Sequence, residues 1–180
     1  MVYRQQGLTL IELMVTLAVL AIVIGIAVPS FSTMINNNRS LALGEELVSV
    51  MNYARSEAVK RGGRVSVCGS TDGVTCNGSW ANNWLVVVDS AATDGAAAVS
   101  VEEVLRLWEV PGNNASVSAT QNSTAVNFVR FNRLGVLGNS TGGAISLSAS
   151  ITGCAGDAAR TVTVGLAGML NVARSTSGCS

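Results

Sequence analysis

The hydrophobic pattern of this chain begins with a long apolar run. The run extends from Leu8 to Val28, reads LTLIELMVTLAVLAIVIGIAV, and contains one charged residue, Glu12. A helix rises about 1.5 Å per residue, so a segment of this length covers the roughly 30 Å hydrocarbon core of a bilayer. The pattern therefore predicts a membrane-spanning helix over residues 8–29, followed by a domain at residues 30–180.

Two features of this segment leave alternatives open. Arg4 before an apolar run is also typical of a cleaved secretory signal, although such a signal is shorter and ends in a small-residue site. Ala27 and Ser30 provide only a weak site of that kind. Because a carboxylate is costly in the bilayer centre, Glu12 lies either at the edge of the span, solvated or protonated, or opposite a cation.

A helical period continues after the span. Apolar residues recur at three- and four-residue steps, while polar residues occupy the other face, so residues 30–61 are predicted to form an amphipathic helix. The apolar positions are Leu43, Leu47, Val50, Met51, Ala54 and Ala58. Gly62 and Gly63 are expected to end the helix.

The two helical segments are predicted to form one helix from Leu8 to Arg61, about 80 Å long. Gly25 and Pro29 are its expected weak points. Proline removes a backbone donor and clashes with the preceding turn, so a helix kink is predicted there.

Beyond Gly63 the period falls to two or to short apolar runs, which are typical of strands. The predicted strands are residues 64–68, 84–89, 101–108, 127–132, 144–150, 160–166 and 169–174. Residues 90–100 and 111–125 are rich in small and polar residues and are predicted to be loops. The expected fold class is α+β, with a long N-terminal helix packed against antiparallel β-sheet and a β-rich region at residues 64–180.

Composition narrows the function. The 180 residues are 48% hydrophobic and 12% charged, contain no histidine, and balance eleven basic against eleven acidic residues. A chain with no histidine and few charged residues has few groups for acid-base chemistry near neutral pH, and its sequence contains no nucleophile elbow or phosphate loop. We therefore expect that it is not an enzyme and has no cofactor or small-molecule substrate. The balanced charge also provides no strong field to attract nucleic acid.

The four cysteines, Cys68, Cys76, Cys154 and Cys179, are an even number in a chain predicted to leave the cytoplasm. Disulfides are therefore favoured over metal ligands, and no metal site is expected because there is no CxxC spacing or histidine. Loop closure favours the local pairs Cys68–Cys76 and Cys154–Cys179 among three connectivities. The alternative is that some cysteines stay free and buried.

Gly7 offers an explanation for Glu12. If the chain were cut after Gly7, the new amino terminus at Leu8 would lie one helical turn before Glu12. That cation could neutralise the carboxylate in its own or a neighbouring subunit, which would favour packing of such helices side by side.

Gly7 followed by Leu8-Thr9-Leu10-Ile11-Glu12-Leu13 resembles the class III signal of type IV pilins and type II secretion pseudopilins. The resemblance implies that residues 1–7 are a leader removed by a prepilin peptidase, which then methylates the amino group of Leu8. The family usually has Phe at that place. The resemblance also implies that Glu12 is the assembly glutamate and Pro29 the kinking proline.

A second resemblance covers most of the chain. The stretches LVSVMNYARSEAVKRGGRVSVC, NWLVVVD, VRFNRLGVLG and RTVTVGLAGMLNVARSTSGC are similar to GspH/FimT-type minor pilins and pseudopilins. The ARSEAVKRG segment also has a structural explanation, in which Ala54 and Ala58 face the sheet and Glu57 pairs with Lys60 or Arg61.

The resemblance implies a minor pilin in the priming or tip complex of a type IV pilus. The partners would be other pilins, the prepilin peptidase and the bacterial inner membrane, with residues 30–180 periplasmic and the assembled pilus on the cell surface. A minor pseudopilin of a type II secretion system is the first alternative. The two cysteine loops favour the pilus, by resemblance.

The second alternative is a DNA-binding pilin for natural transformation. Such FimT-type members carry a GRxR motif, whereas this chain has Gly168-Met169-Leu170-Asn171 there, so nucleic acid is the weaker candidate partner. Candidate phosphate contacts are Lys60, Arg61, Arg64, Arg130, Arg133, Arg160 and Arg174, and candidate stacking residues are Trp80, Trp84 and Trp108. The structural explanation for both sets is solvated surface, salt bridges and core anchors.

Overall fold

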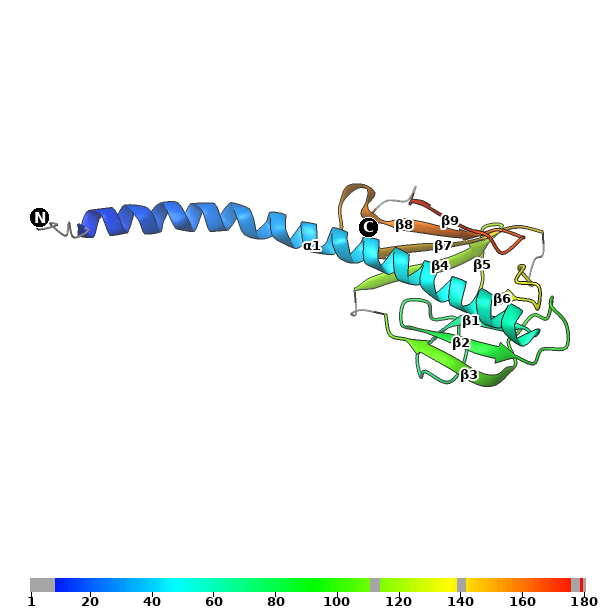
Figure 1. The fold of residues 1–180 in the computed structure, drawn as a ribbon. Coiled ribbons are helices and arrows are strands. Elements are labelled where there is room, and N and C mark those ends of the chain that lie inside the picture. The colour runs from blue at the N-terminus through cyan, green and yellow to red at the C-terminus, as the bar shows by residue number, and fades with distance from the viewer. Residues whose placement is uncertain (1–8, 111–113, 139–141, 176–178, 180) are drawn as a thin grey trace, which may run out of the picture.

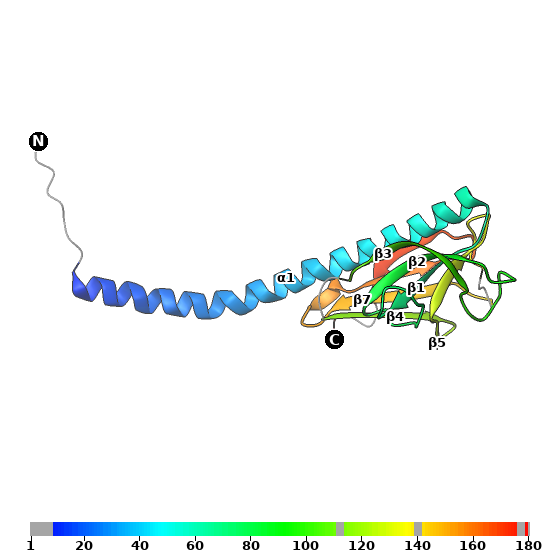
Figure 2. The same cartoon turned by 90° about the horizontal axis from the view of Figure 1, so that it is seen from below.

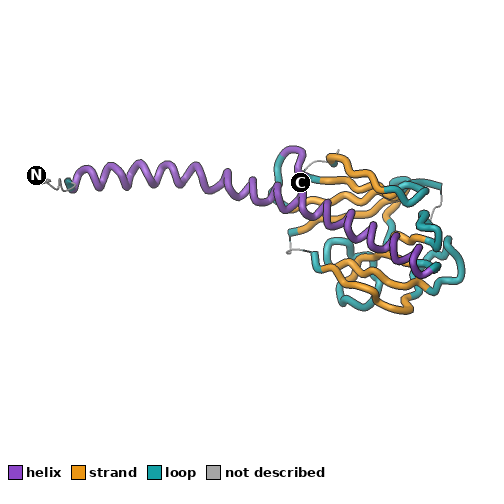
Figure 3. Tube along the Cα trace, viewed as in Figure 1, coloured by secondary structure: helices purple, strands orange, loops and turns teal. Residues whose placement is uncertain are grey.

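The computed structural model describes residues 9–110, 114–138, 142–175 and 179. Within these residues a long α-helix precedes a β-rich domain, and the first half of the helix extends away from the domain (Figure 1). Figure 3 shows the same division, with every described strand gathered beside the second half of the helix. The predicted α+β fold, a long helix packed on antiparallel sheet, is confirmed.

Helix α1 spans Leu10–Arg61. Its N-cap is Thr9, whose hydroxyl oxygen accepts a hydrogen bond from the backbone N–H of Glu12 at 3.3 Å. That bond satisfies one of the free donors of the first helical turn. The C-cap is Gly62, whose φ of 61° lies in the left-handed region that glycine adopts without a Cβ penalty. Leu8, the predicted first residue, lies outside the described residues.

The helix passes Gly25 and Pro29 without interruption. Figure 2 shows α1 as a gently curved rod, with no sharp corner between its two halves. Because proline has no backbone N–H, the carbonyl of Gly25 lacks its usual donor four residues later. The kink predicted at these two residues stays a prediction.

Two antiparallel sheets form the domain. The first has the order β3-β2-β1-β6, with β1 at Val65–Ser70, β2 at Asn83–Asp89, β3 at Val101–Trp108 and β6 at Phe128–Phe131. The second has the order β5-β4-β7-β8-β9, with β4 at Ala115–Gln121, β5 at Thr124–Ala125, β7 at Ile145–Ile151, β8 at Arg160–Val164 and β9 at Leu170–Arg174. A short 3₁₀ helix, η1, occupies Gly156–Ala158 between β7 and β8.

The core lies between α1 and the two sheets. All six apolar residues predicted for the inner face of the helix are fully buried, and they join Trp84, Phe131 and Leu147 from the strands in one cluster. Burial of each large apolar side chain stabilises the fold by about 1.5–3 kcal/mol. The amphipathic pattern of residues 30–61 therefore positions both sheets on one side of the helix.

The structure corrects one prediction about the strands. Residues 111–125 were expected to form a loop, but β4 and β5 occupy most of that segment. Along β4 the side chains of Val117, Ala119 and Gln121 are buried in alternation with more exposed serine and threonine, so small residues form a half-buried strand here. The other predicted strands are present, with ends that differ by at most two residues, and β3 has the predicted bounds.

Candidate functional site

The N-terminal half of α1 is an apolar surface that its own domain does not cover. Its large apolar side chains are half or more exposed: Leu10, Ile11, Leu13, Met14, Val15, Leu17, Val19, Leu20, Ile22, Val23, Ile24, Ile26 and Val28. By length and composition α1 could cross a membrane, and none of its apolar window is buried within the described residues. An exposed apolar surface of this size marks an interaction with lipid or with other chains.

Glu12 lies in the first turn of this exposed half. Its carboxylate is close to the helix N-terminus, where the aligned peptide dipoles favour a negative charge. Thr9 and Glu12 also have the spacing of a capping box, and the Thr9 hydroxyl already accepts the Glu12 N–H. Gly7 and Leu8 lie outside the described residues, so the predicted cleavage, methylation and charge pair stay predictions.

The helix is fastened to the domain shortly after the apolar half ends. The Ser40 hydroxyl accepts the backbone N–H of Ile151 at 2.8 Å, and the Asn37 side-chain oxygen accepts the N–H of Ala155 at 2.8 Å. Asn36 also donates to the carbonyl of Gly153 at 3.4 Å. These bonds join α1 to the end of β7 and to the loop that follows it, so the helix is fixed to the sheets from Asn36 onward.

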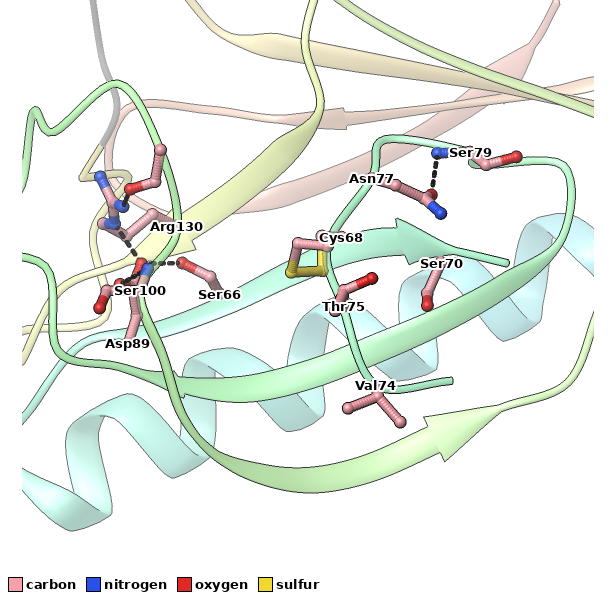
Figure 4. The surroundings of a disulfide bond; sticks show 12 residues. Ser66, Cys68, Ser70, Val74, Thr75, Asn77, Ser79, Asp89, Ser100 and Arg130 are labelled. Carbon is pink, nitrogen blue, oxygen red and sulfur yellow. Dashed lines mark hydrogen bonds and ion pairs between the residues drawn. A yellow bond between two sulfur atoms is a disulfide. The ribbon is translucent and has the colours of Figure 1, made fainter. Parts of the chain in front are cut away.

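The same loop is closed by a disulfide between Cys154 and Cys179, 25 residues apart. A second disulfide joins Cys68 on β1 to Cys76 in the loop before β2, 8 residues away (Figure 4). These are the two local pairs that loop closure favoured from the sequence. Each closed loop restricts the unfolded chain and stabilises the domain by about 2–4 kcal/mol.

Asp72 organises the loop closed by Cys68–Cys76. Its carboxylate accepts hydrogen bonds from the hydroxyl of Thr75 at 2.6 Å, from the N–H groups of Thr75 and Val74 at 2.8 and 2.9 Å, and from the Ser70 hydroxyl at 2.9 Å. These donors, led by the Thr75 hydroxyl, hold the pKa of Asp72 well below its usual range. The loop has a defined shape with Val74 exposed on it.

The structure excludes Arg130 as a phosphate contact, although the sequence made it a candidate for that role. Its side chain is fully buried on β6, where Nε donates to the Asp89 carboxylate at 2.7 Å (Figure 4). Its terminal nitrogens donate to the carbonyls of Asp94, Ala96 and Ala98 at 2.7–3.0 Å. Arg130 therefore holds the loop between β2 and β3 and cannot reach a ligand.

Most of the other candidate phosphate contacts are paired with carboxylates. Glu57 accepts from Arg61 at 2.9 Å and from Lys60 at 3.3 Å, and these donors lower the pKa of Glu57. Arg61 also pairs with Glu103 at 2.8 Å. Two further ion pairs in the described residues are Arg64–Asp94 and Arg174–Asp157, while Arg160 donates to the carbonyls of residues 157–159.

The tryptophans serve the core. Trp80 and Trp84 are buried, and their indole N–H groups donate to the carbonyls of Val126 and Trp80 at 2.8 Å. Trp108 is half-buried edge-on to Tyr53, with ring centroids 5.3 Å apart. The core-anchor interpretation is therefore correct for Trp80 and Trp84, which cannot stack on bases.

No group of three or more His, Cys, Asp or Glu side chains among the described residues could hold a metal ion. A surface hollow of about 530 Å³ with a mixed polar and apolar lining lies where α1 ends, lined by residues 62–64, 92–94 and 132–134. Arg64 and Asp94 face each other there at 2.6 Å, which satisfies both charges. The hollow offers no converging set of free polar groups.

Comparison with solved structures shows the same fold in two proteins. The type IV minor pilin FimU of Pseudomonas aeruginosa PAO1 has 22% sequence identity, with TM-scores of 0.53 and 0.56 in two crystal forms. The match covers 76% and 78% of this chain and 94% and 92% of FimU. The minor pseudopilin EpsH of the Vibrio cholerae type 2 secretion system has 12% identity and a TM-score of 0.50, covering 76% of this chain and 97% of EpsH.

Family models give the assignment. The prokaryotic N-terminal methylation motif matches residues 3–28, which include Gly7, Leu8 and Glu12. No curated protein matches significantly. A model described as type II transport protein GspH matches residues 43–168, which include most of the packed part of α1 and every strand of both sheets except β9. Because this match covers well over half of the sequence, the chain belongs to the GspH family.

Proposed function

We propose that this chain is a minor pilin of a type IV pilus and that it acts in the priming or tip complex that supports pilus assembly. The observation that carries the proposal is the division of α1 into an exposed apolar half and a half that holds the two-sheet domain. Before assembly the exposed half would cross the inner membrane once, with residues 30–180 in the periplasm. After assembly other pilins would cover it, and the filament would lie on the cell surface.

A minor pseudopilin of a type II secretion system is the second candidate. The name of the matching family, type II transport protein GspH, and the fold of EpsH favour the pseudopilin, whereas the fold of FimU agrees equally with a pilus subunit. Deletion of the gene separates the two candidates. Loss of surface pili with normal protein secretion supports the pilus, and loss of secretion with normal pili supports the pseudopilus.

The proposal includes processing by a prepilin peptidase. The methylation motif at residues 3–28 supports cleavage after Gly7 and methylation of Leu8. Mass spectrometry of the membrane-extracted protein is expected to find a chain that begins at Leu8 with one methyl group, and Gly7→Val is expected to leave the precursor intact. An intact Met1 end in cells with an active peptidase, or cleavage beyond Ala27, would contradict this step.

Glu12 tests the assembly role directly. Glu12→Ala removes the carboxylate that would pair with an amino terminus at Leu8 in a neighbouring helix, so the amount of the protein in sheared filaments should fall several-fold. Glu12 is about 40 Å along α1 from Ser40, where the helix is buried against the domain, so the disulfide-bonded domain should fold normally. Glu45→Ala, which removes an exposed carboxylate from the domain half, is the matched control.

DNA binding is the competing function to exclude. Residues 168–171 carry no arginine, and most of the other candidate cations are paired or buried. The detergent-solubilised protein is expected to bind duplex DNA weakly at low salt. Tight binding that weakens steeply with salt would indicate phosphate contacts and favour the DNA receptor, above all if Glu12→Ala still assembled.

A further inference from the structure

The end of the domain furthest from the apolar half of α1 carries a second exposed apolar surface. It consists of Val59 on α1, Leu134 in the turn after β6, and Leu166 and Met169 in the turn between β8 and β9, which we call the distal patch. These side chains are 53%, 71%, 54% and 64% exposed. The turns that carry them lie at the end of the sheets near the C-terminus of α1 (Figure 1).

Close backbone packing holds the distal patch together. A Cβ on Gly168 would overlap the carbonyl oxygen of Gly135, and a Cβ on Gly135 would lie 2.9 Å from a methyl carbon of Val59. The same carbonyl accepts a hydrogen bond from Nε of Arg55 on α1 at 3.0 Å. Both turns are therefore seated on the last turns of α1, so little ordering is needed before a partner binds.

The edge of the distal patch is cationic. Arg133, next to Leu134, is exposed and forms no ion pair within the part of the chain that the structure describes. The Lys60 side chain is also largely exposed. The carboxylate on this turn of α1, Glu57, is shared between Lys60 and Arg61. A complementary surface would therefore be apolar at its centre and carry carboxylates at its edge.

The distal patch also continues the outward face of α1. Asn52, Ser56 and Val59 are exposed at three- and four-residue steps, so they form one stripe along the side of the helix that the domain leaves free. The stripe leads from the patch toward the apolar half, which other subunits would cover in a filament. A subunit that packs along α1 therefore reaches the distal patch.

We propose that the distal patch docks an adjacent filament subunit through an apolar surface of that subunit edged by carboxylates. The proposal rests on the proposed function and names a contact of the domain, separate from the contacts of the apolar half of the helix.

A photo-crosslinking amino acid at position 169 of the full-length protein tests this contact in cells that assemble filaments. After irradiation and shearing, mass spectrometry should identify an adduct with a different pilin-type subunit. The same amino acid at Val74, which is 61% exposed in the loop closed by Cys68–Cys76, is the matched control and should give at most a tenth of the adduct. Arg133→Glu should lower the adduct at position 169 several-fold.

The outcomes separate the docking proposal from the proposed function. If the protein is present in filaments but position 169 gives no adduct, or no more than position 74, the docking proposal fails and the proposed function stands. An adduct at position 169 only with lipid, or only with a second copy of this chain, also overturns the docking proposal. If the wild-type protein is absent from sheared filaments, the proposed function fails, and the docking proposal fails with it.

Discussion

Replacing Arg130 with methionine removes one half of a buried ion pair. The guanidinium lies 2.7 Å from the Asp89 carboxylate, and both side chains are fully buried. The substitution also removes the donors to the carbonyls of Asp94, Ala96 and Ala98. Methionine fills a similar volume, so the effect comes from the charge left behind and from the loop that loses its donors.

The expected loss of unfolding free energy is about 3–5 kcal/mol, because removal of one partner leaves an uncompensated buried charge. Asp89 keeps its bonds from the Ser66 hydroxyl at 2.7 Å and from the N–H groups of Ser100 and Ala91 at 2.9 and 3.0 Å, which favours the lower end of that range. Arg130→Met combined with Asp89→Asn should cost less than the sum of the two single substitutions, because neither charge is then left alone.

Urea unfolding of the full-length protein in detergent micelles measures this loss, and the fluorescence of buried Trp80 and Trp84 reports the domain. Arg133→Met, an exposed arginine in the turn after β6, is the control and should change the unfolding free energy by less than about 0.5 kcal/mol. If Arg130→Met loses less than about 1 kcal/mol, the buried pair does not hold the loop as we argue.

The same pair predicts a pH dependence. Burial raises the pKa of Asp89, but hydrogen bonds from Ser66, the Ser100 N–H and Arg130 outweigh burial, so the pKa lies below the ordinary 3.8. A lowered folded-state pKa contributes stability that is fully present above the unfolded-state pKa and is lost as pH falls through the folded-state value. Below pH of about 4, Asp89→Asn should therefore reduce the slope of unfolding free energy against pH, by at most about 1.4 kcal/mol per pH unit.

The remaining predictions concern packing and loops, and urea unfolding of the full chain measures each of them. Gly44→Ala should lower the unfolding free energy by about 1–3 kcal/mol, because the new Cβ would lie 2.7 Å from Cβ of Arg160. An unchanged unfolding free energy would show that β8 can move away from the helix at little cost. Ser123→Gly should raise the unfolding free energy by up to about 1 kcal/mol, because Ser123 has a φ of 64° in the turn between β4 and β5, and glycine removes a left-handed strain of about 1–2 kcal/mol while it increases the freedom of the unfolded chain. Replacing Cys154 and Cys179 with serine should lower it by about 2–4 kcal/mol, and non-reducing peptide mapping should recover this pair in the wild type.

The elements that sequence reasoning predicted best are those with a long or strong period. The inner face of α1 repeats its apolar positions over residues 43–58, and every one of them is buried. The VEEVLRLW strand is bounded by polar and turn residues, so its ends at Val101 and Trp108 were predicted correctly. Period and turn chemistry act locally, and a single sequence is sufficient to detect them.

The missed features depend on contacts between distant residues. β4 has an alternating pattern, but its alternation sets valine and alanine against serine, which is a weak contrast of hydrophobicity. Arg130 was misplaced because its partner, Asp89, is 41 residues away on another strand. The sequence does contain one indication of this pair. Asp89 follows the apolar run WLVVV at the end of a strand, and a carboxylate that is buried there requires a hydrogen-bond donor. The two-sheet arrangement itself depends on β6 pairing with β1, which no local pattern indicates.

Of the two candidate interaction surfaces, the sequence predicts one and not the other. The exposed half of α1 follows from composition and length alone, because an apolar run without a polar face cannot be covered by a domain on one side. The distal patch does not follow from the sequence, because it combines single residues from α1 and two turns, separated by as many as 110 positions. In the sequence its members look like ordinary surface residues. They form one patch only because the fold packs the turns of Gly135 and Gly168 against each other.

One continuous helix connects these two surfaces, and that connection has a mechanical consequence. Glu12 and Val59 lie about 70 Å apart along α1, and the bonds at Asn37 and Ser40 fasten the domain to the helix where it leaves the free half. If α1 stays straight at Gly25 and Pro29, a change in how neighbouring helices hold the free half therefore turns the domain with it. The packing of the helices then sets the direction in which the distal patch faces. A domain cut from the free half of α1 would keep the patch, including Val59, but neighbouring helices would no longer set its orientation.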